Sequence, residues 1–166
     1  VTFIGHYEKY RAECIKAIVD SGVKVKVWGE YWERYAKWHP WARDVVIGKS
    51  IICEQYCLAL SSAKICLGLL SKFMPETTTT RSFEIPASGT FMLAERTKEH
   101  MELFEEGKEA EFFSSKSELI QKAHYYLEHP QKRNDIARAG RQRCVNSGYN
   151  FQNRLKDILE KVHEIK

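Results

Sequence analysis

The chain has 166 residues, 43% of them hydrophobic, and a formal net charge of +4. This length suits one compact domain with a substantial apolar core. The mild positive charge favours a phosphorylated ligand. The sequence has no Lys/Arg-rich arm and no RNA-binding aromatic signature, so we do not expect nucleic acid as a partner.

No apolar run approaches the ~20 residues that a membrane span requires, and no signal peptide is visible. The five cysteines are Cys14, Cys53, Cys57, Cys66 and Cys144. Their spacing matches no zinc site, so we expect no metal and free thiols in a reducing, cytoplasmic environment. The chain starts at Val1 directly in a strand-like run, which we interpret as the start of a piece of a longer protein.

The first part of the chain predicts a strand, a helix and a second strand. Residues 1–5 are an apolar run that ends in glycine, which is typical of a buried strand. Residues 11–22 place apolar side chains at helical spacing. In residues 23–29, β-branched valines alternate with lysines, which is typical of a second strand. This βαβ order implies a parallel sheet with a right-handed crossover. Residues 31–44 are rich in aromatics without a clean period, so we predict a loop there with at most a helical turn.

The rest of the chain continues this alternation and ends in helices. We predict helices over residues 50–62, 82–88, 114–129, 130–148 and 150–166, strands over 63–70, 90–95 and 109–113, and a short helix or turn over 100–107. Ser115 and Glu118 have capping-box spacing, Pro130 suits a first helical turn, and Asn150 suits a cap. We therefore expect a Rossmann-like parallel sheet flanked by helices over residues 1–149, with a C-terminal helix over residues 150–166.

Ligands of such sheets bind outside the carboxyl ends of the strands. That rule selects the loops that follow Ile4, Trp28, Leu70 and Glu95. It makes residues 71–84 a binding loop by position, although the threonine run within it resembles a linker.

The proline at position 86 limits where the next helix begins. Proline is tolerated in a first helical turn, so the helix must begin near residues 81–84. Its unpaired N–H groups would face the strand ends together with the hydroxyls of Thr79, Thr80 and Ser82, which makes an anion site suited to a diphosphate. Arg81 adds a forked donor for phosphate oxygens.

Two glutamates flank these threonines. Glu84, in the first helical turn, can accept hydrogen bonds from both hydroxyls of a ribose, or it can simply complement the helix dipole. Glu76 lies on the preceding loop, so the two acids can flank one extended ligand.

A second loop of interest is GHYEKYR, residues 5–11. Gly5 permits close backbone approach, and Arg11 can reach a phosphate or remain an exposed helical residue. His6 is either a donor to phosphate or an ordinary loop histidine.

Together these residues resemble a known family. Glu76 and Glu84, separated by seven residues and followed by Gly89 and an apolar strand, resemble the E-x7-E signature of group 1 glycosyltransferases, which have the two-domain GT-B fold. The stretches TTRSFEIPASGTFMLAE and ELFEEGKEAEFFSSKSELIQKAHYYLEHPQKRNDIARAG are most similar to the branch that includes spore maturation proteins.

The resemblance implies a role for several residues. Glu76 would contact the donor sugar, Glu84 the ribose, and the backbone around Thr79 and Thr80 the diphosphate. Arg11 stands at the spacing of a family lysine, whereas His6 replaces the family's usual arginine after Gly5.

The resemblance also implies that this chain is the C-terminal half of a GT-B enzyme, which binds a nucleoside-diphosphate sugar as donor. Its expected partner is an N-terminal acceptor domain, without which we expect no activity. The last helix, residues 150–166, would pack on this domain or toward the N-terminal one. The full enzyme would transfer a hexose-type sugar, with retention, and peripheral membrane association of that full protein stays open. Arg11 and Arg81 would stabilise the leaving diphosphate in place of a metal or cofactor.

Two other readings remain. The first is a non-catalytic nucleotide-binding or interaction module with the same fold. The second, a flavodoxin-like or receiver domain, is disfavoured because no acidic cluster follows the strands.

Overall fold

A six-stranded parallel sheet forms the centre of the molecule. The computed structural model describes residues 1–164, with the backbone alone for residue 157. The strands are β1 (Thr2–Ile4), β2 (Lys26–Trp28), β3 (Val46–Gly48), β4 (Cys66–Gly68), β5 (Met92–Glu95) and β6 (Glu111–Phe113). They lie in the order β3-β2-β1-β4-β5-β6, and every neighbouring pair is parallel. The predicted Rossmann-like α/β fold is confirmed.

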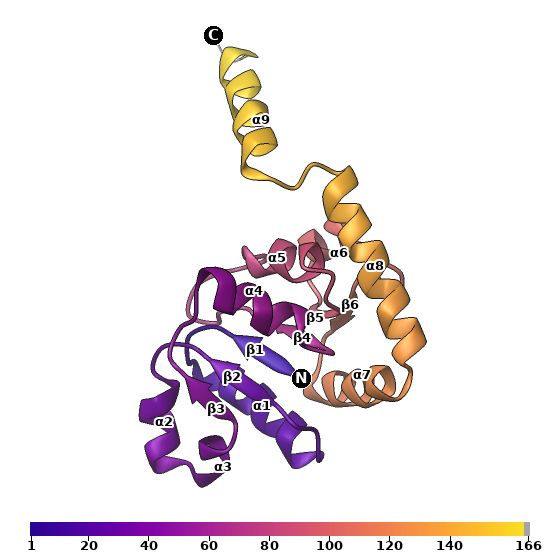
Figure 1. Ribbon diagram of the computed structural model, residues 1–166. Coiled ribbons are helices and arrows are strands. Elements are labelled where there is room, and N and C mark those ends of the chain that lie inside the picture. Colours follow the sequence, from indigo (N-terminus) through magenta and orange to yellow (C-terminus); the bar gives the residue numbers. More distant parts are fainter. Residues whose placement is uncertain (165–166) are drawn as a thin grey trace.

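Helices cover both faces of this sheet (Figure 1). They are α1 (Lys9–Asp20), α2 (Trp32–Trp38), α3 (Pro40–Arg43), α4 (Cys53–Ser61), α5 (Arg81–Ala87), α6 (Lys98–Leu103), α7 (Lys116–Glu128), α8 (Pro130–Asn146) and α9 (Phe151–Glu164). The Ser115 side chain accepts a hydrogen bond from the Glu118 N–H, so the predicted cap of α7 is confirmed.

The core has two parts, one on each face of the sheet. One cluster joins strand residues such as Phe3 and Leu93 to Ile15 of α1 and Leu119 of α7. The other joins Met92 of β5 to α4, α5 and the end of α8. Because both faces are covered, β1, β4, β5 and β6 are buried along their whole length, and their sequences do not alternate between apolar and polar residues.

The prediction of a loop over residues 31–44 was wrong, because this segment contains α2 and α3. Trp32 is fully buried, and its Nε1–H donates to the Gly5 carbonyl at 2.8 Å. The rings of Tyr7 and Tyr35 stack at 4.5 Å, so the aromatic run packs on itself instead of following one helical stripe. The strand β3 was also missed, because it has three residues and its central Ile47 is exposed.

The helix α5 begins at Arg81, within the predicted window. Pro86, however, stands in its second turn and not in its first, which corrects the expectation. Since proline has no N–H, it cannot bond to the Ser82 carbonyl, and the helix ends one residue later, at Ala87.

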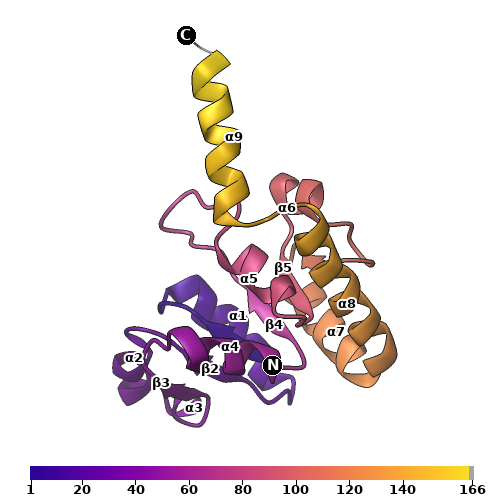
Figure 2. The same cartoon turned by 45° about the horizontal axis from the view of Figure 1, so that its top comes forward.

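The last helix, α9, projects away from the rest of the molecule (Figures 1 and 2). Before it, the ring of Tyr149 packs against Phe83 and Phe104 at centroid distances of 5.3 and 6.0 Å. The helix was predicted to reach residue 166, but residues 165 and 166 lie outside the described part. Among the described residues, none of the helices is long and apolar enough to cross a membrane.

Candidate functional site

The sheet order reverses between β1 and β4, and the candidate site lies at the carboxyl ends of these two strands. Two cavities of about 640 and 380 Å³ open there, and they share His6, Thr80 and Arg81 as lining residues. This position is the switch point at which open α/β sheets bind ligands.

Two arginines from opposite sides of the switch point approach one ring. The guanidinium carbons of Arg11, on α1, and Arg81, on α5, each lie 5.9 Å from the centroid of the Phe3 ring. Arg11 is 3% exposed, and Arg81 is partly buried. Two like charges therefore flank the same ring at the edge of the sheet.

Their charges are compensated unequally. Arg11 forms ion pairs with Glu8 at 3.1 Å and with Glu76 at 3.5 Å. Arg81 donates from Nη1 to the Ile4 carbonyl at 3.3 Å, but among residues 1–164 it has no ion pair. The Nε atoms of both arginines are buried without a hydrogen-bond partner in the described part of the chain. Burial lowers the pKa of Arg81, and the neighbouring charge of Arg11 lowers it further.

The two predicted glutamates line the two different cavities. Glu76 lies on the loop after β4, where its Oε2 accepts hydrogen bonds from the Ser71 N–H at 2.7 Å and from Arg11 at 3.5 Å. Glu84 lies in the first turn of α5, is exposed, and accepts a hydrogen bond from the Tyr56 hydroxyl at 2.5 Å. The structure therefore places Glu76 before the helix, as predicted, with Thr79 and Thr80 between the two acids.

The predicted donor residues between them differ in accessibility. Thr80 lines both cavities and precedes α5, whereas Thr79 lines the larger cavity. The Ser82 side chain is 3% exposed, and its hydroxyl bonds the Thr79 N–H at 3.1 Å and His100 Nε2 at 2.8 Å. Ser82 lines neither cavity, so its hydroxyl supports the loop from inside the protein.

Three residues that the sequence did not single out hold the loop in place. Glu95, at the end of β5, accepts hydrogen bonds from the Leu70 N–H at 2.7 Å and from Tyr10 at 3.2 Å, and it forms an ion pair with Lys72. Glu99 accepts hydrogen bonds from the hydroxyls of Thr77 and Thr78. His100 is the third. The only sequence signal for Glu95 was its position at the carboxyl end of a buried strand.

Gly5 is required for the close approach of β1 and α5. A Cβ atom there would lie 2.9 Å from Phe3 Cζ and 3.0 Å from Arg81 Nη1. Any side chain would therefore displace the ring or the guanidinium that define the site. His6, the next residue, is exposed and lines both cavities.

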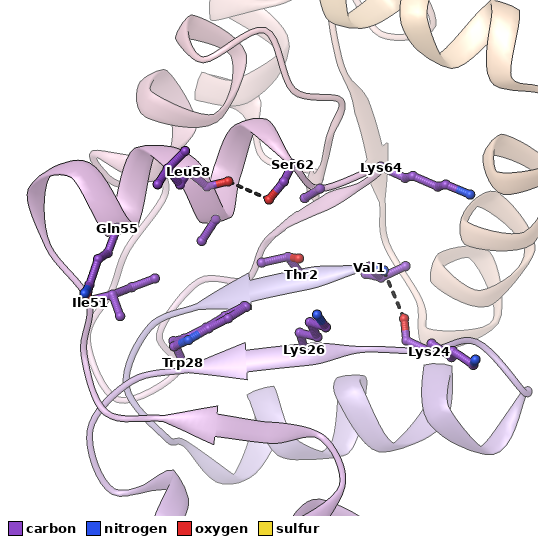
Figure 3. Close-up of a pocket in the computed structure, with 12 residues that line it drawn as sticks. Val1, Thr2, Lys24, Lys26, Trp28, Ile51, Gln55, Leu58, Ser62 and Lys64 are labelled. Carbon is purple, nitrogen blue, oxygen red and sulfur yellow. Dashed lines mark hydrogen bonds between the residues drawn. The ribbon is translucent and has the colours of Figure 1, made fainter.

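A separate cavity of about 720 Å³ lies between α4 and the strands β1 and β2 (Figure 3). Its charged side chains are Lys24, Lys26 and Lys64, and Trp28 forms part of its wall. It contains none of the predicted site residues.

Comparison with known proteins agrees with this geometry. A family model described as "Glycosyl transferase-like" matches residues 11–160. The chain belongs to this family. A search of curated protein sequences found no match.

Solved structures of glycosyltransferases have the same fold as this glycosyl transferase-like chain. Anabaena Alr3699/HepE in complex with UDP-glucose is 14% identical, with a TM-score of 0.72 over 98% of this chain and 48% of that one. The pneumococcal O-GlcNAc transferase GtfA, in complex with UDP and GlcNAc, is 13% identical, with a TM-score of 0.66 over 99% of this chain and 35% of that one.

A third similar structure is itself a single domain. It is the C-terminal domain of the group 1 glycosyl transferase LpcC from Francisella tularensis, which is 12% identical, with a TM-score of 0.61 over 90% of this chain and 86% of that one. By contrast, the chain spans about half the length of the HepE structures. The predicted relation to GT-B glycosyltransferases is confirmed at the level of family and fold.

The cysteines and acids form no metal cluster in the part of the chain that the structure describes. Among residues 1–164, no group of three His, Cys, Asp or Glu side chains could hold a metal ion. Cys14, Cys66 and Cys144 are buried, whereas Cys53 and Cys57 are exposed on α4.

Proposed function

We propose that this chain is the donor-binding domain of a glycosyltransferase that transfers a hexose-type sugar from a nucleoside-diphosphate sugar to an acceptor. Within the glycosyl transferase-like family, its motifs favour the spore maturation protein branch. The acceptor would bind to a further, N-terminal domain, and residues 1–166 alone would be inactive. We propose a cytoplasmic enzyme, with membrane association confined to the surface of the full protein.

The observation that carries this proposal is the pair of arginines at the switch point, of which Arg11 is buried and Arg81 is partly buried. Arg81 has no ion pair among the described residues, and burial beside Arg11 lowers its pKa. A buried charge of this kind is unfavourable unless it is compensated, so an anionic ligand between the two guanidinium groups would stabilise the site. A diphosphate supplies that charge, and its oxygens can accept two parallel hydrogen bonds from a planar guanidinium group.

The same pair suits the chemistry of glycosyl transfer. When the bond between the anomeric carbon and the diphosphate oxygen breaks, negative charge develops on the leaving diphosphate. Arg11 and Arg81 would stabilise that charge, together with the backbone around Thr79, Thr80 and Gly5, which would lie next to the diphosphate. No metal or cofactor would then be required. Retention at the anomeric carbon follows from the family resemblance.

The two glutamates divide the ligand between them in this proposal. Glu76 lines the larger cavity, which would hold the sugar, and Glu84 lines the smaller one, which would hold the ribose. HepE was solved with UDP-glucose and GtfA with UDP and GlcNAc, which supports a nucleotide sugar as ligand of the common fold.

A non-catalytic nucleotide-binding module is the second candidate. The observation that favours it is His6, which replaces the family's usual arginine at the edge of both cavities and weakens the positive field there. Such a module would bind nucleotide without transferring sugar.

Calorimetric titration of the chain with UDP, GDP and their sugars tests the proposal. We expect binding that Glu84→Ala weakens at least tenfold, as expected for loss of a charged hydrogen-bond acceptor. Glu128→Ala, at an exposed position at the end of α7, should bind as the unmodified chain does. If the folded chain binds no nucleoside diphosphate, the proposal is wrong for this domain. Sugar release from the donor by the full-length protein would then distinguish an enzyme from a binding module.

A further inference from the structure

A hydrogen bond between α4 and α5 closes one side of the smaller cavity. The Tyr56 hydroxyl donates to Glu84 Oε2 at 2.5 Å, and both side chains line this cavity with Arg81. Nothing in the sequence pairs these two residues, since they are 28 positions apart.

The two partners differ in how firmly they are held. The Tyr56 ring is half-buried and packs against the core cluster that contains Leu60 and Ile85. Glu84 is exposed, and without the hydrogen bond its side chain would sample several rotamers, which a ligand would have to order on binding. A ring fixed by packing therefore holds a carboxylate that would otherwise move.

The Tyr56 hydroxyl keeps its proton and can therefore donate to Glu84 at all ordinary pH values. Burial raises the pKa of Tyr56, and the hydrogen bond to Glu84 raises it further, so the phenol remains a donor. Among the side chains that the structure describes, none donates a hydrogen bond to the other carboxylate oxygen of Glu84, Oε1. It is left to accept one from a ligand.

We propose that Tyr56 is a positioning residue, which fixes the Glu84 carboxylate for the ribose hydroxyls of a nucleoside diphosphate. This inference rests on the proposed function, because it assigns the ribose to the smaller cavity. Tyr56 acts through Glu84, so it determines how strongly the site prefers a ribose to a deoxyribose. It has no effect on the part of the site that holds the phosphates.

The test compares Tyr56→Phe with the unmodified chain. The phenylalanine ring keeps the packing and removes only the hydroxyl. Dissociation constants are measured for UDP and GDP, for 2′-deoxy-UDP and 2′-deoxy-GDP, and for inorganic pyrophosphate. Tyr125→Phe is the matched control, because it removes a hydroxyl that accepts from Lys132 on the exposed surface of α7 and α8.

We expect Tyr56→Phe to weaken UDP or GDP binding about tenfold, in line with loss of a hydrogen bond to a charged group. The preference for ribose over deoxyribose should fall at least threefold, while pyrophosphate binding and the Tyr125→Phe control stay unchanged. An unchanged ribose preference overturns the inference, and so does an equal loss for UDP and pyrophosphate, which indicates general distortion. If the unmodified chain binds pyrophosphate but no nucleotide, or binds nothing, the proposed function itself fails and the inference with it.

Discussion

The imidazole of His100 is fully buried beneath the loop that carries the threonines. Its Nδ1–H donates to the Glu95 carbonyl at 2.7 Å, so its Nε2 has no proton and accepts the Ser82 hydroxyl at 2.8 Å. The Ser82 oxygen in turn accepts the Thr79 N–H. This chain of bonds fits a neutral histidine, whose protonation would reverse the bond to Ser82, and it links the loop to pH.

A pH dependence of stability follows from His100. Burial lowers the pKa of His100 below the ordinary 6.5. Between these two pKa values the unfolded chain binds a proton at this residue, whereas the folded chain does not. The free energy of unfolding should therefore fall as the pH drops below about 6.5, by at most about 1.4 kcal/mol per pH unit from this group, and level off below the folded pKa. Urea unfolding between pH 8 and pH 4.5 measures this.

The His100→Gln variant isolates the effect, because other groups also titrate in this range. Its curve should be flatter than that of the unmodified chain near pH 6, whereas His129→Gln, at an exposed position, should leave the slope unchanged. Parallel curves for the chain and for His100→Gln would refute the assignment.

Gly5 offers a second test at this scale. An alanine there would press on Phe3 and Arg81, so we expect Gly5→Ala to destabilise the fold by about 1–3 kcal/mol and to weaken binding of pyrophosphate. Gly48→Ala is the matched control, because a Cβ atom at Gly48 meets nothing within 4 Å. Denaturant unfolding and calorimetry give the two readouts, and equal stabilities of the two variants would contradict the expectation.

Single residues of the site were predictable only where strand ends and local motifs mark them. Arg11, Glu76 and Arg81 follow buried strands closely, and the structure brings them together. Tyr56 and His100 were not found, because their partners lie 28 and 18 residues away and only the packing of α4 and α6 brings them near. Spacing along a chain carries no information about such contacts.

At the scale of elements, the short helix α5 is held between the sheet and α8. Gly140 of α8 allows this contact, since a Cβ atom there would lie 2.3 Å from the Glu109 carbonyl oxygen and 3.3 Å from Pro86 Cβ. Because α5 carries Arg81 and Glu84, the way in which α8 packs against α5 also influences the positions of these two site residues.

We expect Gly140→Ala to destabilise the protein, although alanine is the better helix former. The gain in helix propensity is about 1 kcal/mol, whereas a backbone clash in a packed interface costs about 1–3 kcal/mol or more. The exposed Asn134→Ala variant in the same helix has only the propensity gain and should be slightly more stable than the unmodified chain. Thermal or urea unfolding measures both, and a stabilised Gly140→Ala protein would contradict the structure.

Elements with a strong period were predictable, and those defined by tertiary contacts were not. The helices α1, α7 and α8 and the buried strands carry their own patterns. The segment 31–44 has no single apolar face, because its aromatic rings stack on one another, and β3 is a short edge strand with an exposed centre. Pro86 shows a similar limit, since its place in the second turn depends on the start of α5 at Arg81, which the proline itself does not determine.

At the scale of the whole molecule, α9 stands apart from the globular body (Figure 2). Its apolar residues are largely exposed, with Phe151 at 90%. They are Phe151, Leu155, Ile158, Leu159 and Val162. The division into residues 1–149 and a helix over residues 150–166 that packs on this domain or toward an N-terminal one remains a proposal.

Removal of α9 should leave the body intact. A chain that ends at Asn150 keeps Tyr149 and its contacts with Phe83 and Phe104, so we expect its melting temperature to lie within about 2 °C of that of the full chain, since few buried contacts are lost. Circular dichroism measures the transition. A fall of more than about 5 °C, which corresponds to roughly 2 kcal/mol in a domain of this size, would mean that α9 packs on the body.

The order of the strands has a mechanical consequence. The chain before α4 builds β1, β2 and β3, the chain after it builds β4, β5 and β6, and the two half-sheets meet at β1 and β4. The residues paired in register there are Thr2 and Cys66, whereas β4 and β5 pair over three positions. Arg11 belongs to the first half and Arg81 to the second. An anion bound by both arginines would link the two half-sheets. Ligand binding would therefore make the sheet more rigid, and a more rigid sheet would bind the anion more tightly.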